Sequence, residues 1–127
     1  MRTQHKCFMA DSRLLICEVA FDEETRPFSG ATMYVRLEDV SWADAPATVV
    51  AEQVVHNVSY QPGDKRRVVV NLRGKVLDKG SRYAVYVHVD IDGDRQITPG
   101  DYVSTQSYPV LTFGHPDRVT VRVRKVA

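Results

Sequence analysis

The segment from Asp90 to Asp101 (DIDGDRQITPGD) is where carboxylates gather at regular spacing. Asp90, Asp92 and Asp94 match positions 1, 3 and 5 of a twelve-residue calcium loop. The later ligand positions of such a loop fall on Gln96, Thr98 and Asp101. Because Ca²⁺ is held by about six to eight oxygen atoms, alternating carboxylates on a curled loop are suitable ligands. The spacing therefore makes calcium a candidate cofactor of this segment.

Two positions depart from the calcium-loop pattern and leave a second interpretation open. Position 6 is Arg95, where the sharp turn normally requires glycine, and position 12 is Asp101, which is shorter than the usual glutamate. The flanking residues alternate like strands, so a helix–loop–helix unit is not expected. In the alternative, Arg95 neutralises the acids and the aspartates cap turns of a structural loop. We favour this structural loop and keep the calcium-binding domain as the alternative.

His88 provides the only arrangement that suggests catalysis. It lies two residues before Asp90, on the same face of the expected strand, and a histidine–aspartate pair can orient a general base. No local motif marks a nucleophile, since Ser104 and Ser107 have the pattern of ordinary strand residues. The sequence therefore predicts a protein that is not an enzyme, and a small hydrolase ranks last among the candidate functions.

Trp42 is the only tryptophan and lies in a loop-like stretch. If it is buried against the domain, it anchors that loop; if it is exposed, it is a contact residue for a partner protein. We favour anchoring, because loops of this length usually pack on their own domain. In the exposed case Trp42 is the expected partner-binding residue.

Charge is nearly balanced, with 17 lysines and arginines against 16 aspartates and glutamates, for a net charge of +1. This balance does not predict a nucleic-acid partner. A basic face recurs near the C-terminus, at Arg118, Arg122, Arg124 and Lys125. Charged side chains protect the edge strands of sheets from pairing with other chains, and we expect that role here. Binding of an acidic partner is the alternative.

The two cysteines and the N-terminus bear on the compartment. Cys17 lies in an apolar run and is expected to be a buried, inert thiol, while Cys7 falls in the presumed tail; a disulfide between them stays open. No apolar stretch is long enough for a membrane span, and residues 1–12 lack the apolar region of a signal peptide. The chain as written is expected in the cytoplasm, or in the cell envelope if a leader was removed.

Alternation of apolar and polar residues dominates the rest of the chain. Leu15, Cys17, Val19 and Phe21 share one face of a first strand, and six further segments follow, of which the one over residues 50–56 alternates less cleanly. They begin near residues 33, 50, 68, 83, 103 and 119, the sixth being broken at Pro109. Turn residues such as glycine, proline and aspartate separate them. We predict an all-β, antiparallel sandwich of about seven strands over residues 13–127, preceded by a flexible tail over residues 1–12.

Residues 35–53 (VRLEDVSWADAPATVVAEQ) carry a resemblance to a known family. The run V-x-L-E-D-V-S-x-A-D-A-P-A, followed by a strand ending A-E-Q, resembles the YbaY/YscW-type lipoproteins, which include type III secretion pilotins. The strand over residues 83–90 (YAVYVHVD) fits the order of elements in that family. The resemblance extends over residues 13–125.

This resemblance implies a compact β-sandwich with a binding role and no catalytic residues. Our leading hypothesis is accordingly a non-catalytic protein-binding or assembly module, whose partner is another protein. Addition of a strand at a sheet edge, or docking in an apolar groove, is the expected mode of recognition.

Overall fold

The computed structural model describes residues 13–22, 24–42, 44–63, 67–74 and 78–127. All the regular secondary structure in these ranges is β-strand. The elements are β1 (Arg13–Phe21), β2 (Phe28–Asp39), β3 (Thr48–Tyr60), β4 (Val68–Gly74), β5 (Tyr83–Asp90), β6 (Tyr102–Ser104), β7 (Pro109–Val110) and β8 (Arg118–Lys125). The expected all-β class is therefore confirmed. The expected N-terminal tail, with Cys7, lies outside the described residues. No helix in the described ranges is long and apolar enough to cross a membrane.

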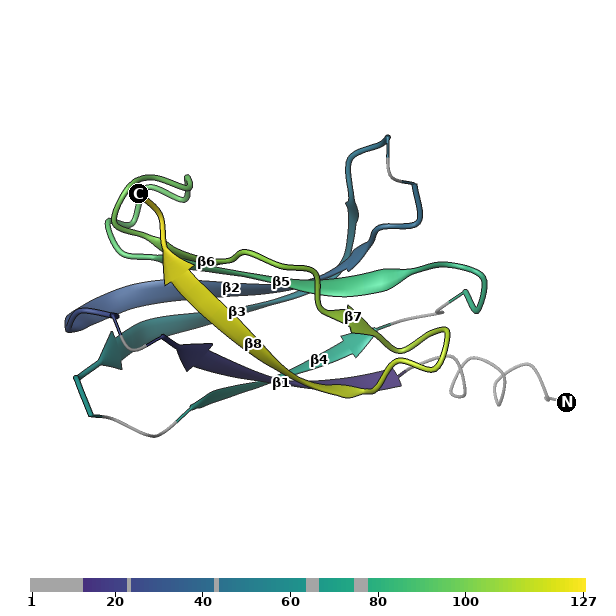
Figure 1. Cartoon of the computed structure of the whole chain (residues 1–127), viewed down its shortest axis with the longest axis horizontal. Helices are drawn as coiled ribbons and strands as arrows, with labels where there is room; N and C mark the ends of the chain where they lie inside the picture. Colours follow the sequence, from purple (N-terminus) through teal and green to yellow (C-terminus); the bar gives the residue numbers. More distant parts are fainter. Residues whose placement is uncertain (1–12, 23, 43, 64–66, 75–77) are drawn as a thin grey trace, which may run out of the picture.

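The strands form one continuous sheet in the order β3-β2-β5-β6-β8-β1-β4, with β7 paired to β5. The sheet folds over, so that in Figure 1 β2 and β5 lie above β1 and β4, and β8 crosses diagonally from β1 toward β6. The outermost strands β3 and β4 contact each other, which brings the two ends of the sheet together. The two expected layers are thus parts of a single, nearly closed sheet.

One strand pair differs from the antiparallel expectation. β1 and β8 run parallel, with Cys17 opposite Val119 and Phe21 opposite Val123, whereas the other pairs are antiparallel. The sheet is therefore mixed. Because β8 lies between β6 and β1, its basic face is not on an edge strand, and the expected protection of a sheet edge by these residues is wrong.

The core follows the predicted period of two residues. Leu15, Cys17 and Val19 of β1 are fully buried, and the alternate apolar residues of β2, β5 and β8 join them in one cluster. Successive side chains of a strand point to opposite faces, so one face each of β1, β2, β5 and β8 closes over this core, whereas β3 contributes only Val58 to the buried residues. Burial raises the pKa of the Cys17 thiol to about 12, in keeping with its expected inert role.

The expected sixth strand is divided into two short pieces. β6 ends at Ser104 and β7 begins at Pro109, so the break precedes the proline at which it was predicted. The intervening Tyr108 stays attached to the sheet, because its carbonyl accepts the N–H of Val85 (3.1 Å) and its hydroxyl accepts the N–H of Arg122 (2.9 Å). The chain after β7 then forms a compact loop that returns to β8.

Candidate functional site

The end of β5 and the start of β6 position the acidic loop. Asp90 is the last residue of β5 and Asp101 directly precedes β6, and both side chains are 1% exposed. Asp90, Asp92, Asp94 and Asp101 each place one carboxylate oxygen within 4.8 Å of the others. The sequence-predicted acids are thus brought together at one end of the sheet.

Backbone N–H groups satisfy the two buried carboxylates. Asp90 accepts the N–H of Gly93 at Oδ1 (3.0 Å) and that of Arg95 at Oδ2 (2.8 Å). Asp101 accepts the N–H of Ile91 at Oδ1 (2.9 Å) and that of Thr98 at Oδ2 (3.3 Å). Such bonds stabilise buried carboxylates without an ion, because they replace the water that burial removes. These contacts are the turn-capping pattern of the structural-loop interpretation.

The exposed part of the loop is also held by internal hydrogen bonds. Thr98 donates its hydroxyl to Asp92 (3.0 Å), and Gln96 donates its N–H to Asp94 (3.0 Å). Partial desolvation raises the pKa of Asp92, but hydrogen bonds with Asp90, Asp94 and Thr98 outweigh it and lower the pKa overall. The Gln96 N–H lowers the pKa of Asp94, but desolvation and the nearby Asp92 and Asp90 carboxylates raise it overall. Joint ionisation of these neighbouring carboxylates is therefore disfavoured.

Arg95 adopts the backbone conformation that glycine would have at the same loop position. Its φ angle is 65°, in the left-handed region, so the chain makes the sharp bend without glycine. The departure at position 6 therefore does not prevent the loop from curling around its acids. What the loop offers chemically is a cluster of oxygen atoms of the kind that hard cations prefer.

His88 pairs with Asp101 and not with a nucleophile. Its Nε2 lies 2.9 Å from Asp101 Oδ2, and its ring stacks on that of Tyr34 with centroids 5.8 Å apart. The side chain of His88 is only 4% exposed. The hydroxyl oxygen of Ser104 accepts the N–H of Val87 (3.0 Å), and within the described residues no hydrogen bond joins Ser104 to His88. The pair thus braces β5 against the acidic loop.

Trp42 lies apart from the acidic loop, beyond the end of β2. Its side chain is 75% exposed, so the expectation that it anchors the loop is wrong. The loop is held instead by Ser41, whose hydroxyl donates to Asp39 and accepts the N–H of Arg82 (2.9 Å). The Ser41 hydroxyl thus fixes the backbone beside Trp42, while the Trp42 ring stays in solvent.

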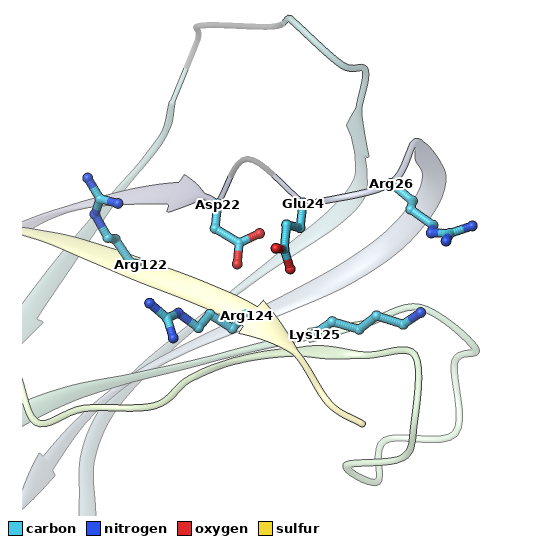
Figure 2. Close-up of a pocket in the computed structure, with 6 residues that line it drawn as sticks. All are labelled: Asp22, Glu24, Arg26, Arg122, Arg124 and Lys125. Carbon is cyan, nitrogen blue, oxygen red and sulfur yellow. The ribbon is translucent and has the colours of Figure 1, made fainter.

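A charged groove of about 780 Å³ lies between the β1–β2 connection and the end of β8. Figure 2 shows Asp22 and Glu24 pointing toward β8, whereas the guanidinium groups of Arg26 and Arg122 point away from them. Arg124 and Lys125 complete the lining. Small-molecule sites are predominantly apolar with a few polar groups, and this groove is lined by charges of both signs. We therefore interpret it as a solvated rim.

A smaller, mostly apolar pocket of about 240 Å³ opens beside the end of β2. Its lining includes Val40, Tyr83, Pro109, Phe113, Arg82 and His115. The residue pattern did not predict this pocket, because Phe113 falls at the end of the expected sixth strand, residues 103–113. Phe113 is also far from Val40 in the sequence, so nothing in the sequence indicated that the two residues line one pocket.

Comparison with known proteins gives one family and one solved structure. Residues 14–123 match the model of the family described as type III secretion system lipoprotein chaperone (YscW). The chain is also similar to the solved structure of an alternative pilotin from the type II secretion system of Vibrio cholerae. That match has 26% sequence identity and a TM-score of 0.72, and it covers 91% of this chain and 98% of the other. No curated protein matches the chain.

Proposed function

The chain belongs to the YscW family of type III secretion system lipoprotein chaperones, and from this premise we propose that it is a non-catalytic module that binds a protein during assembly of a secretion system. The observation that carries the proposal is the match of the family model over residues 14–123. Similarity to a type II pilotin over nearly the full length of both chains supports the same role. The partner is expected to be a protein component of such a system.

We include Trp42 in the surface that meets this partner. A tryptophan that is 75% exposed leaves a large apolar ring in water, and tryptophan is enriched among the residues that dominate binding energy at interfaces. The Ser41 hydroxyl fixes the backbone next to Trp42 by accepting the N–H of Arg82. Less conformational entropy is therefore lost when the partner binds.

Capture of the partner from the native host tests the proposal. The tagged chain is cross-linked in cells and purified, and the attached proteins are identified by mass spectrometry. We expect enrichment of a secretion-system component, reduced recovery with Trp42→Ala and unchanged recovery with Val69→Ala, an exposed apolar residue on β4. Failure to enrich any secretion-system protein above an untagged control would contradict the proposed function.

A second candidate is that the Asp90–Asp101 loop binds calcium. The observation that favours it is the convergence of oxygens from Asp90, Asp92, Asp94 and Asp101 within 4.8 Å. Ca²⁺ would relieve the repulsion that raises the pKa of Asp94. Because the N–H groups already hold Asp90 and Asp101, we expect an ion to rigidify the loop with modest affinity.

A calcium titration followed by thermal unfolding tests this candidate. An ion that binds only the native state raises its stability by mass action, by about 2.7 kcal/mol at a hundredfold excess over Kd. Asp92→Ala should abolish the increase, while Asp117→Ala, which lies outside the loop, should preserve it. An unchanged melting temperature at millimolar calcium would refute the candidate and leave the structural loop.

A further inference from the structure

The loop that follows β7 is held in an unusual backbone conformation. Leu111 has a φ angle of 73°, and the N–H of Thr112 donates to the carbonyl of Val110 (2.8 Å). This is a γ-turn of the rarer, more strained form. Phe113 follows with a φ angle of 56°, a region that bulky residues seldom adopt.

Hydrogen bonds from several directions maintain this conformation. Leu111 donates its N–H to the carbonyl of Pro116 (3.0 Å), and His115 donates to the carbonyl of Thr112 (3.0 Å). The hydroxyl of Thr112 donates to the carbonyl of Ser81 (2.7 Å), which ties the loop to the start of β5. Strain of this kind persists only where the surroundings enforce it, and it concentrates at functional sites.

The enforced conformation presents Phe113 to solvent. Its side chain is 54% exposed at the mouth of the apolar pocket, so it contributes little to the core. The guanidinium carbon of Arg82 lies 4.4 Å from the centre of its ring, which holds the Arg82 charge at the same mouth. An aromatic side chain and a cation are thus prearranged beside an opening lined by Val40, Tyr83 and Pro109.

Size and charge define what this opening accepts. A volume of about 240 Å³ is below the range of about 300–1,000 Å³ for small-molecule sites, but suits side chains that anchor a protein segment. Arg82 and His115 are the only ionisable lining residues besides Tyr83, and no carboxylate is among the described residues that line the pocket. A ligand with a negative group beside its apolar anchor is therefore complementary.

We propose that this pocket is the docking site for a segment of the partner protein in which an apolar side chain lies next to a carboxylate. The apolar side chain enters between Phe113 and Val40, and the carboxylate pairs with Arg82. The proposal rests on the proposed function, because it specifies where and through which chemistry the partner binds.

A peptide display library of random sequence, panned against the purified chain, provides the probe. We expect enrichment of peptides in which a large apolar residue neighbours aspartate or glutamate. Fluorescence anisotropy then measures their affinity for the variants. Phe113→Gly and Arg82→Glu should weaken binding about tenfold or more, the loss expected when an interface anchor is removed, and Val69→Ala should change it less than about twofold.

The Phe113→Gly variant separates binding from folding. Glycine adopts positive φ without strain, so its melting temperature should equal or exceed that of the wild-type chain while peptide binding is lost. Panning repeated on Arg82→Glu should select lysine or arginine in place of the acid. Peptides that bind Phe113→Gly as tightly as wild type, or the absence of enriched peptides, would overturn the docking site.

The same variants in the cell capture experiment distinguish the two proposals. If wild type captures a secretion-system component and Phe113→Gly captures it equally, the proposed docking site is refuted and the proposed function stands. If wild type captures none, the proposed function itself fails. Capture by wild type that falls with Phe113→Gly and with Arg82→Glu supports both.

Discussion

At the scale of single residues, Glu18 shows how one carboxylate links three strands. It lies on β1, between β8 and β4 in the sheet, and accepts hydrogen bonds from Arg118 at the start of β8 and from Arg67 just before β4 (3.2 Å for Arg67). The bond from Arg118, followed by that from Arg67, lowers the pKa of Glu18 below its ordinary value of 4.5. The charged form is therefore favoured in the folded state.

This shift predicts the pH dependence of a Glu18→Gln variant. A carboxyl group with a lowered folded-state pKa contributes stability above its unfolded pKa, and the contribution disappears as pH falls through the folded-state pKa. The variant should be less stable than wild type at pH 7, and the difference should shrink from about pH 4.5 downward. Urea unfolding over a pH series measures it. A difference that is constant across the series would show that the charge of Glu18 is not its cause.

Residue patterns predicted the acids of the candidate site well and its apolar residues poorly. The spacing of Asp90, Asp92 and Asp94 indicated a clustered loop, because neighbours on a curled segment must converge. Phe113 was assigned to a strand, because alternation carries no information on its φ angle or on its contact with Arg82. Both depend on hydrogen bonds to distant segments. Trp42 was misassigned for a related reason, because the Ser41 side chain took over the anchoring role.

At the scale of elements, alternation predicted which strand faces are buried. Leu15 of β1 is fully buried, whereas Val69 of the neighbouring β4 is 56% exposed. Leu15→Ala should lower the free energy of unfolding by about 2–5 kcal/mol, because it removes apolar contacts and leaves a cavity. Val69→Ala should change it by less than about 0.5 kcal/mol. Chemical denaturation of both variants makes the comparison, and equal losses would contradict the assigned faces.

Strand direction was not accessible from alternation. A strand shows the same period of two whether its neighbour is parallel or antiparallel, so the parallel pairing of β1 with β8 could not be read from either segment. The same limit hid the position of β8 inside the sheet. Its basic residues resembled those that protect an edge strand, although the sheet places β6 on one side of β8 and β1 on the other.

The sheet order makes β8 the connection between two parts of the molecule. Without β8, β1 and β4 have no hydrogen-bonded link to the other described strands, and an isolated strand pair is marginal in water. A chain that ends after Asp117 should therefore lose cooperative unfolding, whereas a chain that lacks only Ala127 should keep it. Circular dichroism during urea unfolding tests this prediction. A cooperative transition in the shorter chain would show that β8 is dispensable.

At the scale of the whole molecule, one nearly closed sheet supports several separate surface features. The acidic loop lies where β5 joins β6, the charged groove lies beside the end of β8, and the apolar pocket lies beside the end of β2. Turns and loops carry these features, while the apolar face of the sheet supplies the rigidity that positions them. The chain belongs to the YscW family, and the proposed role in secretion-system assembly rests on this membership and not on the geometry.

The assembly state of the captured partner tests the assembly role most directly. Blue native electrophoresis compares the fraction of that partner in its high-mass, assembled form in cells with and without this chain. The account predicts that the assembled fraction falls when the chain is absent, returns with wild type or Val69→Ala, and does not return with Phe113→Gly. An assembled fraction that is the same with and without the chain would contradict the assembly role.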